Sequence, residues 1–439
     1  MKLLKILNKL IDSNSMHGFS KILTNFRYYN KSVRIIKNLI RKLIDKTGNV
    51  LFYYKKNDFD IPRNKVKRIL FISLYFRGDI LFHTPVLKLL KLIFKNAEID
   101  VWVKSRSKEI LEGNEDVNDI IIFDDVKTEQ SFEMFNINYK SKLAFLKKLR
   151  RSKYDLVIDF TGLFSTALFT YFMKPLYSIG KYEQGFGFLY NKFIGEDFSK
   201  IQGHLILKYM NIIKNAFDIS DEEWLSLIER VPPKGIIYLN DDNIFEIENM
   251  LLSRGIDLLK PLICIHLTAG WSAKRWSLEN FGQLIKTLIN SDCEIAVVGN
   301  VYDKKEFSKV ISSIQSLVPQ KNLNSLFFDL SVIMNAALIK RSNLFIGSDS
   351  LPLHIAGAVG TPSIGLFGPT NPDFSNPIGQ DHHYLYKILD CSSPVNHQYC
   401  TRNAGRTCNT IDCMKMISTD DVLQMIKEVI KVDNLLEKR

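Results

Sequence analysis

The chain has 439 residues, of which 46% are hydrophobic and 24% are charged. This composition is that of a soluble globular protein, and the length exceeds one typical domain, so we expect two domains with additions. No stretch approaches the about 18 consecutive apolar residues that a membrane-spanning helix needs. The six cysteines fit a reducing compartment.

The positive charge of the chain is concentrated at its N-terminus. Residues 1–68 hold 17 lysines and arginines against four aspartates, whereas the whole chain carries +12, so the remainder is nearly neutral. Leu3, Leu7 and Leu10 share one helical stripe, and residues 1–65 therefore predict a basic, amphipathic helical arm. Such an arm can bind an anionic membrane surface through residues 1–60. A solvated arm packed on the protein is the alternative.

The sequence disfavours nucleic acid as a partner, and it disfavours export through a signal peptide. Nucleic acid is not expected as a partner, because no basic footprint continues into the nearly neutral globular part. Lys2, Lys5 and Lys9 interrupt the apolar positions, so the N-terminus lacks the continuous core of a signal peptide. We expect a cytoplasmic protein, either free or peripheral on the cytoplasmic face of the inner membrane.

The first globular segment predicts a parallel sheet. Residues 66–250 form the expected N-terminal domain. Its buried strands are predicted at 66–74, 98–103, 119–123 and 155–160, with a helix at 84–94. Strands that alternate with helices favour a doubly wound, Rossmann-like α/β fold.

The alternation restarts after a loosely patterned stretch at residues 232–242, and residues 251–420 form the expected second domain. Its predicted strands are 262–267, 294–298, 325–328, 345–349 and 363–367, and its predicted helices are 278–289 and 331–340. A C-terminal helix is expected at 421–439. The whole chain thus predicts two Rossmann-like domains preceded by a basic arm.

The stretch Phe345–Pro372 (FIGSDSLPLHIAGAVGTPSIGLFGPTNP) carries the strongest pattern. A buried strand stops at Asp349, and a helix follows with Ser350 as a natural N-cap and Pro352 in its first turn. A helix N-terminus supplies N–H groups and partial positive charge, and can hold a diphosphate. An ordinary crossover without a ligand is the alternative.

The first strand also ends in polar residues. Gly78 permits a tight turn there, and Asp79 is then presented at the carboxyl edge of the sheet, where a general base would stand. The same aspartate is equally suited to capping the next helix.

Cations and a ribose-binding candidate lie in the second half. His266–Trp276 (HLTAGWSAKRW) places Lys274 at the same kind of edge, where it can meet a diphosphate, and Trp276 can stack on a base or cover the following helix. Asp303 follows the next strand and is placed to accept ribose hydroxyls. His354 lies in the helix after Asp349; taken alone, it is better explained as a core histidine.

No metal site is predicted. Cys391, Cys400, Cys408 and Cys413 lack the paired spacing of a zinc ribbon, which favours structural thiols or a disulfide. The one Asp-x-Asp, residues 58–60, lies in the arm and is interpreted as linker.

Taken together, four motifs resemble glycosyltransferase family 9, the ADP-heptose:lipopolysaccharide heptosyltransferases, over roughly residues 66–425. They are ILFISLYFRGDILFHTPVLKLL, DLVIDFTGLFSTAL, ICIHLTAGWSAKRWSLENFGQL and GSDSLPLHIAGAVGTPSIGLFGPTNP, in the order that the family has. The resemblance implies a GT-B fold, with two Rossmann-like domains facing a central cleft. The N-terminal half would bind a lipid-linked saccharide acceptor and the C-terminal half a nucleotide sugar. It also implies inverting transfer without a metal ion or another cofactor.

The resemblance assigns roles by position. Asp79 would be the base, beside Gly78; Lys274 would contact the phosphates of the donor; and Asp303 stands where the family has a ribose-binding glutamate. The remaining donor-site positions are Trp276, Asp349, Ser350, Leu351, His354 and Thr370.

The chain departs from the family where Leu351 replaces a glycine, and where Tyr75-Phe76-Arg77 replaces small residues before Gly78. Heptose transfer to lipopolysaccharide inner core is the leading hypothesis. Transfer of another sugar to O-antigen or a further surface glycan is one alternative, and a catalytically silent nucleotide-sugar-binding homologue is another.

Overall fold

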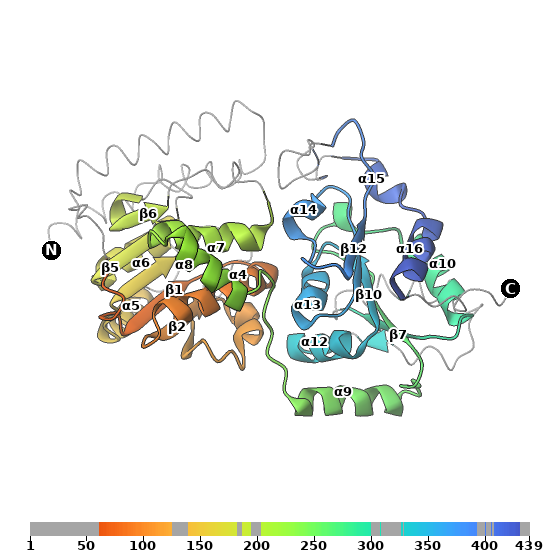
Figure 1. Ribbon diagram of the computed structural model, residues 1–439, viewed down its shortest axis with the longest axis horizontal. Coiled ribbons are helices and arrows are strands. Elements are labelled where there is room, and N and C mark those ends of the chain that lie inside the picture. The colour runs from red at the N-terminus through yellow and green to blue at the C-terminus, as the bar shows by residue number, and fades with distance from the viewer. Residues whose placement is uncertain are drawn as a thin grey trace. The chain divides into compact units, whose positions relative to one another are not determined.

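The computed structural model describes residues 61–124, 139–181, 187–194, 203–299, 308, 326–327, 329–392, 400, 405 and 408–430. The predicted arm at residues 1–60 and the candidate Asp303 lie outside these residues. The chain divides into two compact units (Figure 1). The first ends at Glu196 and lacks Tyr75–Ile93 and Arg106–Val117, which belong with Asp197–Arg439 to the second.

The first unit is built on a six-stranded sheet in which neighbouring strands run parallel, in the order β3-β2-β1-β4-β5-β6. The strands are β1 (Arg68–Ile72), β2 (Glu98–Val103), β3 (Asp119–Ile122), β4 (Leu156–Asp159), β5 (Tyr177–Lys181) and β6 (Lys192–Ile194). The helices α5 (Tyr139–Arg151) and α6 (Phe164–Met173) and the short η3 (Gly187–Leu189) accompany it. Trp102, Phe145 and Phe169 pack edge to face in its core.

The second unit repeats this plan in the order β12-β11-β10-β7-β8-β9, again with parallel neighbours. The strands are β7 (Leu262–His266), β8 (Glu294–Val298), β9 (Leu326–Phe327), β10 (Leu344–Ser348), β11 (Ser363–Leu366) and β12 (His382–Leu385). In both sheets the strand order reverses next to the first strand, between β1 and β4 and between β7 and β10. Open sheets bind ligands at the carboxyl ends of strands at such a point.

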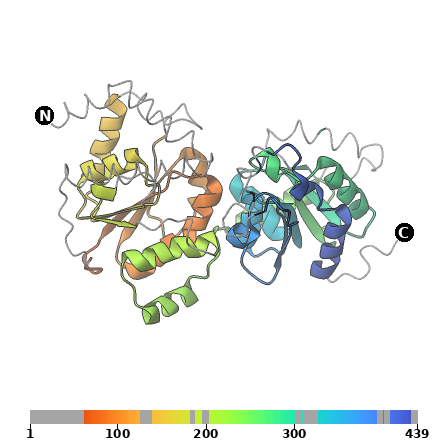
Figure 2. The same ribbon diagram turned by 90° about the horizontal axis from the view of Figure 1, so that it is seen from above.

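The second unit also contains most of the helices. They are α4 (Arg77–Ile93), α7 (Leu205–Ala216), α8 (Asp221–Arg230), α9 (Asp241–Ser253), η4 (Ser272–Lys274), α10 (Leu278–Ile289), α12 (Val332–Arg341), α13 (Leu351–Val359), α14 (Pro372–Ser375), α15 (Asp412–Lys415) and α16 (Thr419–Ile430). The short η1 (Ser105–Leu111) begins at the last residue of a first-unit segment. Helices α4 and α7 pack side by side (Figures 1 and 2). The predicted α/β class with two parallel sheets is confirmed.

The predicted strands and helices mostly have the predicted boundaries, and the start of α4 is the clear exception; β5, β6 and β12 were not predicted. The pattern predicts a helix from residue 84, whereas α4 begins at Arg77 and contains Pro85. A proline inside a helix leaves the carbonyl four residues earlier without its N–H donor. Here the Thr84 hydroxyl donates to the Leu81 carbonyl at 2.7 Å instead, so the helix continues through the proline. Gly78 and Asp79 therefore lie in the first turn of α4 and not in a turn before it.

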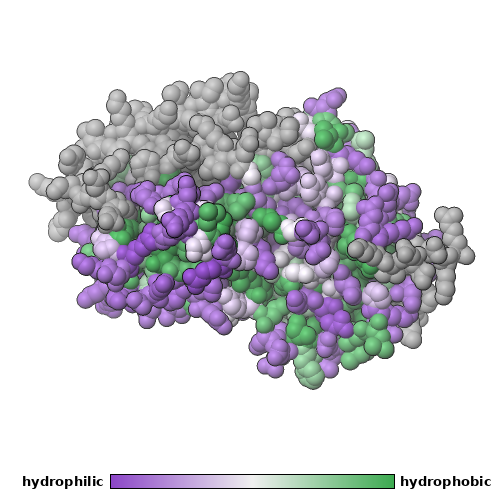
Figure 3. Space-filling view, viewed as in Figure 1, coloured by the Kyte–Doolittle hydropathy of each residue, from purple (hydrophilic) through white to green (hydrophobic). Residues whose placement is uncertain are grey.

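Hydrophilic residues cover much of the described face in Figure 3, with smaller groups of hydrophobic residues between them. None of the helices that the structure describes is both long and apolar enough to cross a membrane.

Candidate active site

The candidate site forms at the carboxyl ends of β7 and β10, where the order of the second sheet reverses. The chain leaves β7 through a short loop into η4, whose last residue is Lys274. It leaves β10 at Asp349 and enters α13 two residues later, with Ser350 as N-cap and Pro352 in the first turn. The predicted strand and helix are confirmed, with Ser350 at the N-cap position, and they bring a cation and a carboxylate from distant parts of the sequence together.

Lys274, Asp349 and His354 form a compact, largely buried charged cluster. The Lys274 Nζ lies 2.5 Å from Asp349 Oδ2 and 3.3 Å from the Asp349 carbonyl oxygen. The His354 Nε2 lies 3.5 Å from Asp349 Oδ1, to which the Ser375 hydroxyl of α14 also donates at 3.2 Å. The Asp349 side chain is only 5% exposed and that of Lys274 13%. A lysine buried to this extent is positioned by its carboxylate and does not sample solvent freely.

The pKa values of the cluster show which groups are charged. Burial alone would raise the pKa of Asp349, but the charge of Lys274, followed by that of His354, outweighs it and lowers this pKa to about 2. Burial lowers the pKa of His354 to about 4, although Asp349 opposes the shift. At neutral pH the site therefore holds a carboxylate, an ammonium and a neutral imidazole.

Three buried polar atoms around this cluster are poorly satisfied: one has no partner in the described part of the chain, and for two the nearest partner, Asp349 for Thr370 and Ser375 for His354, is poorly aligned. They are the Ser348 hydroxyl at the end of β10, His354 Nδ1 and the Thr370 hydroxyl. Nearly all buried polar groups in native proteins are well hydrogen-bonded, so poorly satisfied atoms gathered at one place need an explanation. A polar ligand that enters between β10 and the turn at Thr370 would supply well-aligned partners.

Ser350 occupies the predicted N-cap position but does not cap with its side chain. Its hydroxyl donates to the Ser348 carbonyl at 3.1 Å and lies 3.4 Å from Nδ1 of His266, the last residue of β7. The other ring nitrogen of His266 lies 3.3 Å from the Thr268 hydroxyl. The N–H groups of the first turn of α13 are therefore not taken by this side chain, which suits an anion-binding helix N-terminus. His266 and Thr268 belong to the stretch His266–Trp276, but the sequence predicted no role for them.

The first turn of α4 reaches the same cluster within the second unit. A side chain placed on Gly78 would meet the His354 ring at 3.6 Å, and the ring of Phe82 lies 4.6 Å from that of His354. On its other edge Phe82 contacts the ring of His204, the N-cap of α7. Asp79, next to Gly78, is thus carried on a helical turn that packs directly on His354.

Two buried polar residues of α7 and its N-cap, His204 and Lys208, were not predicted from the sequence. Burial lowers the pKa of His204 to about 4, and its Nε2 lies 3.0 Å from the Asn376 carbonyl oxygen. One turn later Lys208 is 1% exposed, with its ammonium 3.9 Å from the centre of the Phe374 ring. Burial lowers the pKa of Lys208 to about 8. The only available signal was the four-residue spacing, which places both side chains on the buried face of one helix.

A core role replaces the predicted stacking role of Trp276. Its side chain is 1% exposed within the main hydrophobic cluster of the second unit, and its indole N–H donates to the Ile417 carbonyl at 2.8 Å. The ring packs edge to face on Phe281, so it covers the helix that follows, as the alternative had it. The indole ring beside the Lys274 ammonium is instead that of Trp271, at 4.2 Å.

Two of the four clustered cysteines, Cys400 and Cys413, lie against the turn that leads to Thr370. The Cys400 N–H donates to the Pro369 carbonyl at 3.1 Å, and a side chain at Gly368 would meet Cys413 Sγ at 3.2 Å. Burial, followed by the neighbouring Cys400, raises the pKa of Cys413 to about 11, so this thiol stays protonated at neutral pH. We interpret these two cysteines as structural contacts of the turn.

Comparison with known proteins decides the family. Residues 142–403, more than half of the chain, match the sequence profile of glycosyltransferase family 9 (heptosyltransferase). The chain belongs to glycosyltransferase family 9. It is therefore a glycosyltransferase, and the predicted family is confirmed.

Individual relatives agree with this assignment. The chain is 26% identical over 308 residues to lipopolysaccharide heptosyltransferase 3 of Escherichia coli, covering 69% of this chain and 84% of that protein. It is 24% identical to lipopolysaccharide heptosyltransferase 1 of Campylobacter coli, covering 82% and 98%. The solved structure of the E. coli ADP-heptose lipopolysaccharide heptosyltransferase II superposes with a TM-score of 0.64 at 17% identity, covering 83% of this chain and 98% of that one. The fold is thus of the GT-B type.

Proposed function

We propose that this enzyme transfers heptose from ADP-heptose to a lipopolysaccharide inner-core acceptor, with inversion and without a metal ion. The observation that carries the proposal is the cluster of Lys274, Asp349 and His354 beside the N-terminus of α13. The names of the relatives supply the sugar and the acceptor, because three heptosyltransferases of lipopolysaccharide align over most of their length.

The chemistry assigned to each residue follows from its charge and place. The Asp79 carboxylate takes the proton of the acceptor hydroxyl as that oxygen attacks the anomeric carbon, and the nucleoside diphosphate leaves. Lys274 and the N–H groups at the start of α13 offset the charge that develops on the leaving diphosphate, in the role that a metal ion fills in other enzymes. Asp349 holds Lys274 in place, and Thr370 and His354 offer hydrogen bonds to the sugar or the phosphates.

A different nucleotide sugar, used for O-antigen or another surface glycan, is the second candidate. Leu351 is the observation that favours it, because the family has glycine at this first position of α13. A Cβ there limits how closely the backbone approaches a phosphate. We also propose that residues 1–60, which lie outside the described residues, bring the enzyme to the inner membrane and its lipid-linked acceptor.

The test is turnover by the purified full-length protein with a panel of nucleotide sugars and lipopolysaccharide core acceptors, followed by nucleotide release. We expect release with ADP-heptose. Asp79→Ala should reduce turnover by about 10²–10⁴-fold, the range of a lost general base, with nucleotide affinity nearly unchanged.

The matched control is Asp420→Ala, which removes an exposed aspartate from the first turn of α16 and should leave turnover unchanged. Full activity of Asp79→Ala would remove Asp79 as the base. Nucleotide binding without release from any donor would overturn the enzymatic proposal.

A further inference from the structure

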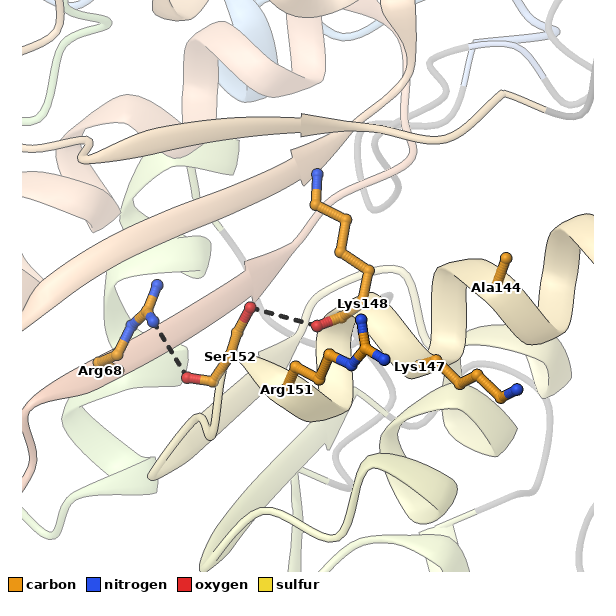
Figure 4. A pocket seen from close by; sticks show the side chains of 6 residues that line it. All are labelled: Arg68, Ala144, Lys147, Lys148, Arg151 and Ser152. Atoms are coloured by element: carbon orange, nitrogen blue, oxygen red, sulfur yellow. Dashed lines mark hydrogen bonds between the residues drawn. The ribbon is translucent and has the colours of Figure 1, made fainter.

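A basic pocket lies in the first unit, away from the residues described so far. Its volume is about 470 Å³, and it is an open depression lined by residues of α5, the residue after this helix and the first residue of β1 (Figure 4). The lining residues are Arg68, Ala144, Lys147, Lys148, Arg151 and Ser152. Four of the six are cationic, and none is acidic.

Most of this charge is not neutralised by the protein. Lys147, Lys148 and Arg151 form no ion pair within the residues that the structure describes. Arg68 is the exception: its Nη2 lies 2.8 Å from the buried Asp100, its Nε lies 3.7 Å from Glu98 Oε2, and its Nη1 donates to the Ser152 carbonyl at 3.1 Å. The pocket therefore combines one fixed guanidinium with three solvated cations, an arrangement suited to a phosphate group.

Helix stability alone does not explain the basic residues of α5. Cations near a helix C-terminus offset a partial charge of about half a unit. In its 13 residues α5 carries six cations and no acidic residue, three of them in the last turn. Its apolar side chains Phe145 and Leu149 are buried in the core, so the helix face that holds Lys147, Lys148 and Arg151 is left for solvent or a partner.

We propose that this pocket and the basic face of α5 bind the phosphate headgroups of an anionic phospholipid membrane. Two observations select a membrane as the occupant. The charge of the pocket is complementary to that of an anionic lipid surface. In addition, Arg68 is the last residue of the 68-residue segment that holds the excess positive charge of the chain. A nucleic-acid site would need basic residues that continue over the fold, or aromatic side chains that stack on bases. The globular part of the chain is nearly neutral, and no aromatic residue lines the pocket.

The experiment measures partition of the full-length protein onto vesicles of phosphatidylcholine alone and of phosphatidylcholine mixed with phosphatidylglycerol, at low and high salt. The wild type should bind only the mixed vesicles, and less at high salt. Each cation at an anionic surface gives about a fivefold gain in partition. The triple variant Lys147→Gln, Lys148→Gln, Arg151→Gln should therefore lose at least about tenfold.

The control variant Lys286→Gln, Lys415→Gln, Lys427→Gln removes the same charge from exposed positions of the second unit. It should lose less than about twofold, because these positions lack the pocket. Equal losses in both variants, unchanged binding of the pocket variant, or tighter binding of the wild type to duplex DNA than to mixed vesicles would overturn the proposal. Vesicle binding requires no turnover, so this result is independent of the proposed reaction. A melting temperature equal to that of the wild type verifies that the pocket variant is folded.

Discussion

In each sheet, a strand beside the point of reversed strand order is terminated by a buried aspartate. The two aspartates differ in their partners. Asp159 ends β4 in the first unit and accepts hydrogen bonds from the N–H groups of Thr161 and Gly162 and from the Tyr190 hydroxyl. Asp349 follows β10 in the second unit and faces Lys274 and His354.

The environments shift the two carboxyl groups in opposite directions. Burial raises the pKa of Asp159, because its partners are neutral and only partly offset the lost hydration. The neighbouring ammonium keeps the pKa of Asp349 at about 2. The same fold position thus serves as a hydrogen-bonded turn in one unit and as a permanently charged centre in the other. A local cation, more than the carboxylate, distinguishes the strand end of the proposed donor site from the strand end at Asp159.

The largest expected effect is the loss of the Asp349 carboxylate. Asp349→Ala leaves the Lys274 ammonium buried without a partner, which should cost about 3–5 kcal/mol of unfolding free energy and abolish nucleotide binding. Urea denaturation and calorimetric titration with ADP measure the two effects.

The double variant Asp349→Ala, Lys274→Met removes the unpaired charge as well. It should regain much of the stability but none of the nucleotide affinity. A double variant no more stable than Asp349→Ala would show that the ion pair is not what Asp349 contributes.

The next largest effect should be a different response of the two units to acid, which lowers the stability of the second unit. The pKa values of His204 and His354 are lowered to about 4, so the unfolded chain takes up more protons than the folded one between pH 6.5 and 4. Stability of the second unit is therefore present above pH 6.5 and lost as the pH falls towards 4, by at most about 3 kcal/mol per histidine. Asp159 acts in the opposite direction, since protonation of a carboxyl group with a raised pKa favours the folded state.

Urea denaturation at pH 7 and pH 4.5 tests this prediction through tryptophan fluorescence. Trp224, Trp271 and Trp276 report on the second unit and Trp102 on the first. His354→Gln should flatten the pH dependence of the second unit. An unchanged slope in this variant would contradict the role assigned to His354.

A smaller effect is expected from Asp159→Asn. The amide oxygen can still accept from the N–H groups of Thr161 and Gly162, and the desolvation cost of a charge disappears, so we expect a loss of about 1 kcal/mol. Nucleotide affinity, measured as above, should not change. A loss of affinity as large as that of Asp349→Ala would end the contrast between the two strand ends.

Sequence pattern predicted nine of the twelve described strands, all but β5, β6 and β12, and it predicted the strand ends that carry Lys274 and Asp349, because buried apolar runs and cap residues are local signals. The sequence pattern did not predict hydrogen bonds between residues that lie far apart in the chain. The bond from Ser375 to Asp349 spans 26 residues, and the contact of His204 with Asn376 spans 172, so no local spacing indicates them. The early start of α4 was missed because a side-chain hydroxyl supplies the donor that Pro85 lacks, which is a tertiary detail.

The smallest effect should come from Leu351, the first residue of α13, where the resemblance to the family leads us to expect a glycine. Leu351→Gly removes the Cβ and lets the backbone N–H groups approach a phosphate more closely, so ADP should bind a few-fold more tightly. Glycine at a helical position costs about 0.8 kcal/mol of stability. Leu351→Ala is the matched control: it shortens the side chain but keeps the Cβ, and should gain no affinity. Equal gains in both variants would mean that the bulk of the leucine, and not the Cβ, sets the approach of the phosphate to α13.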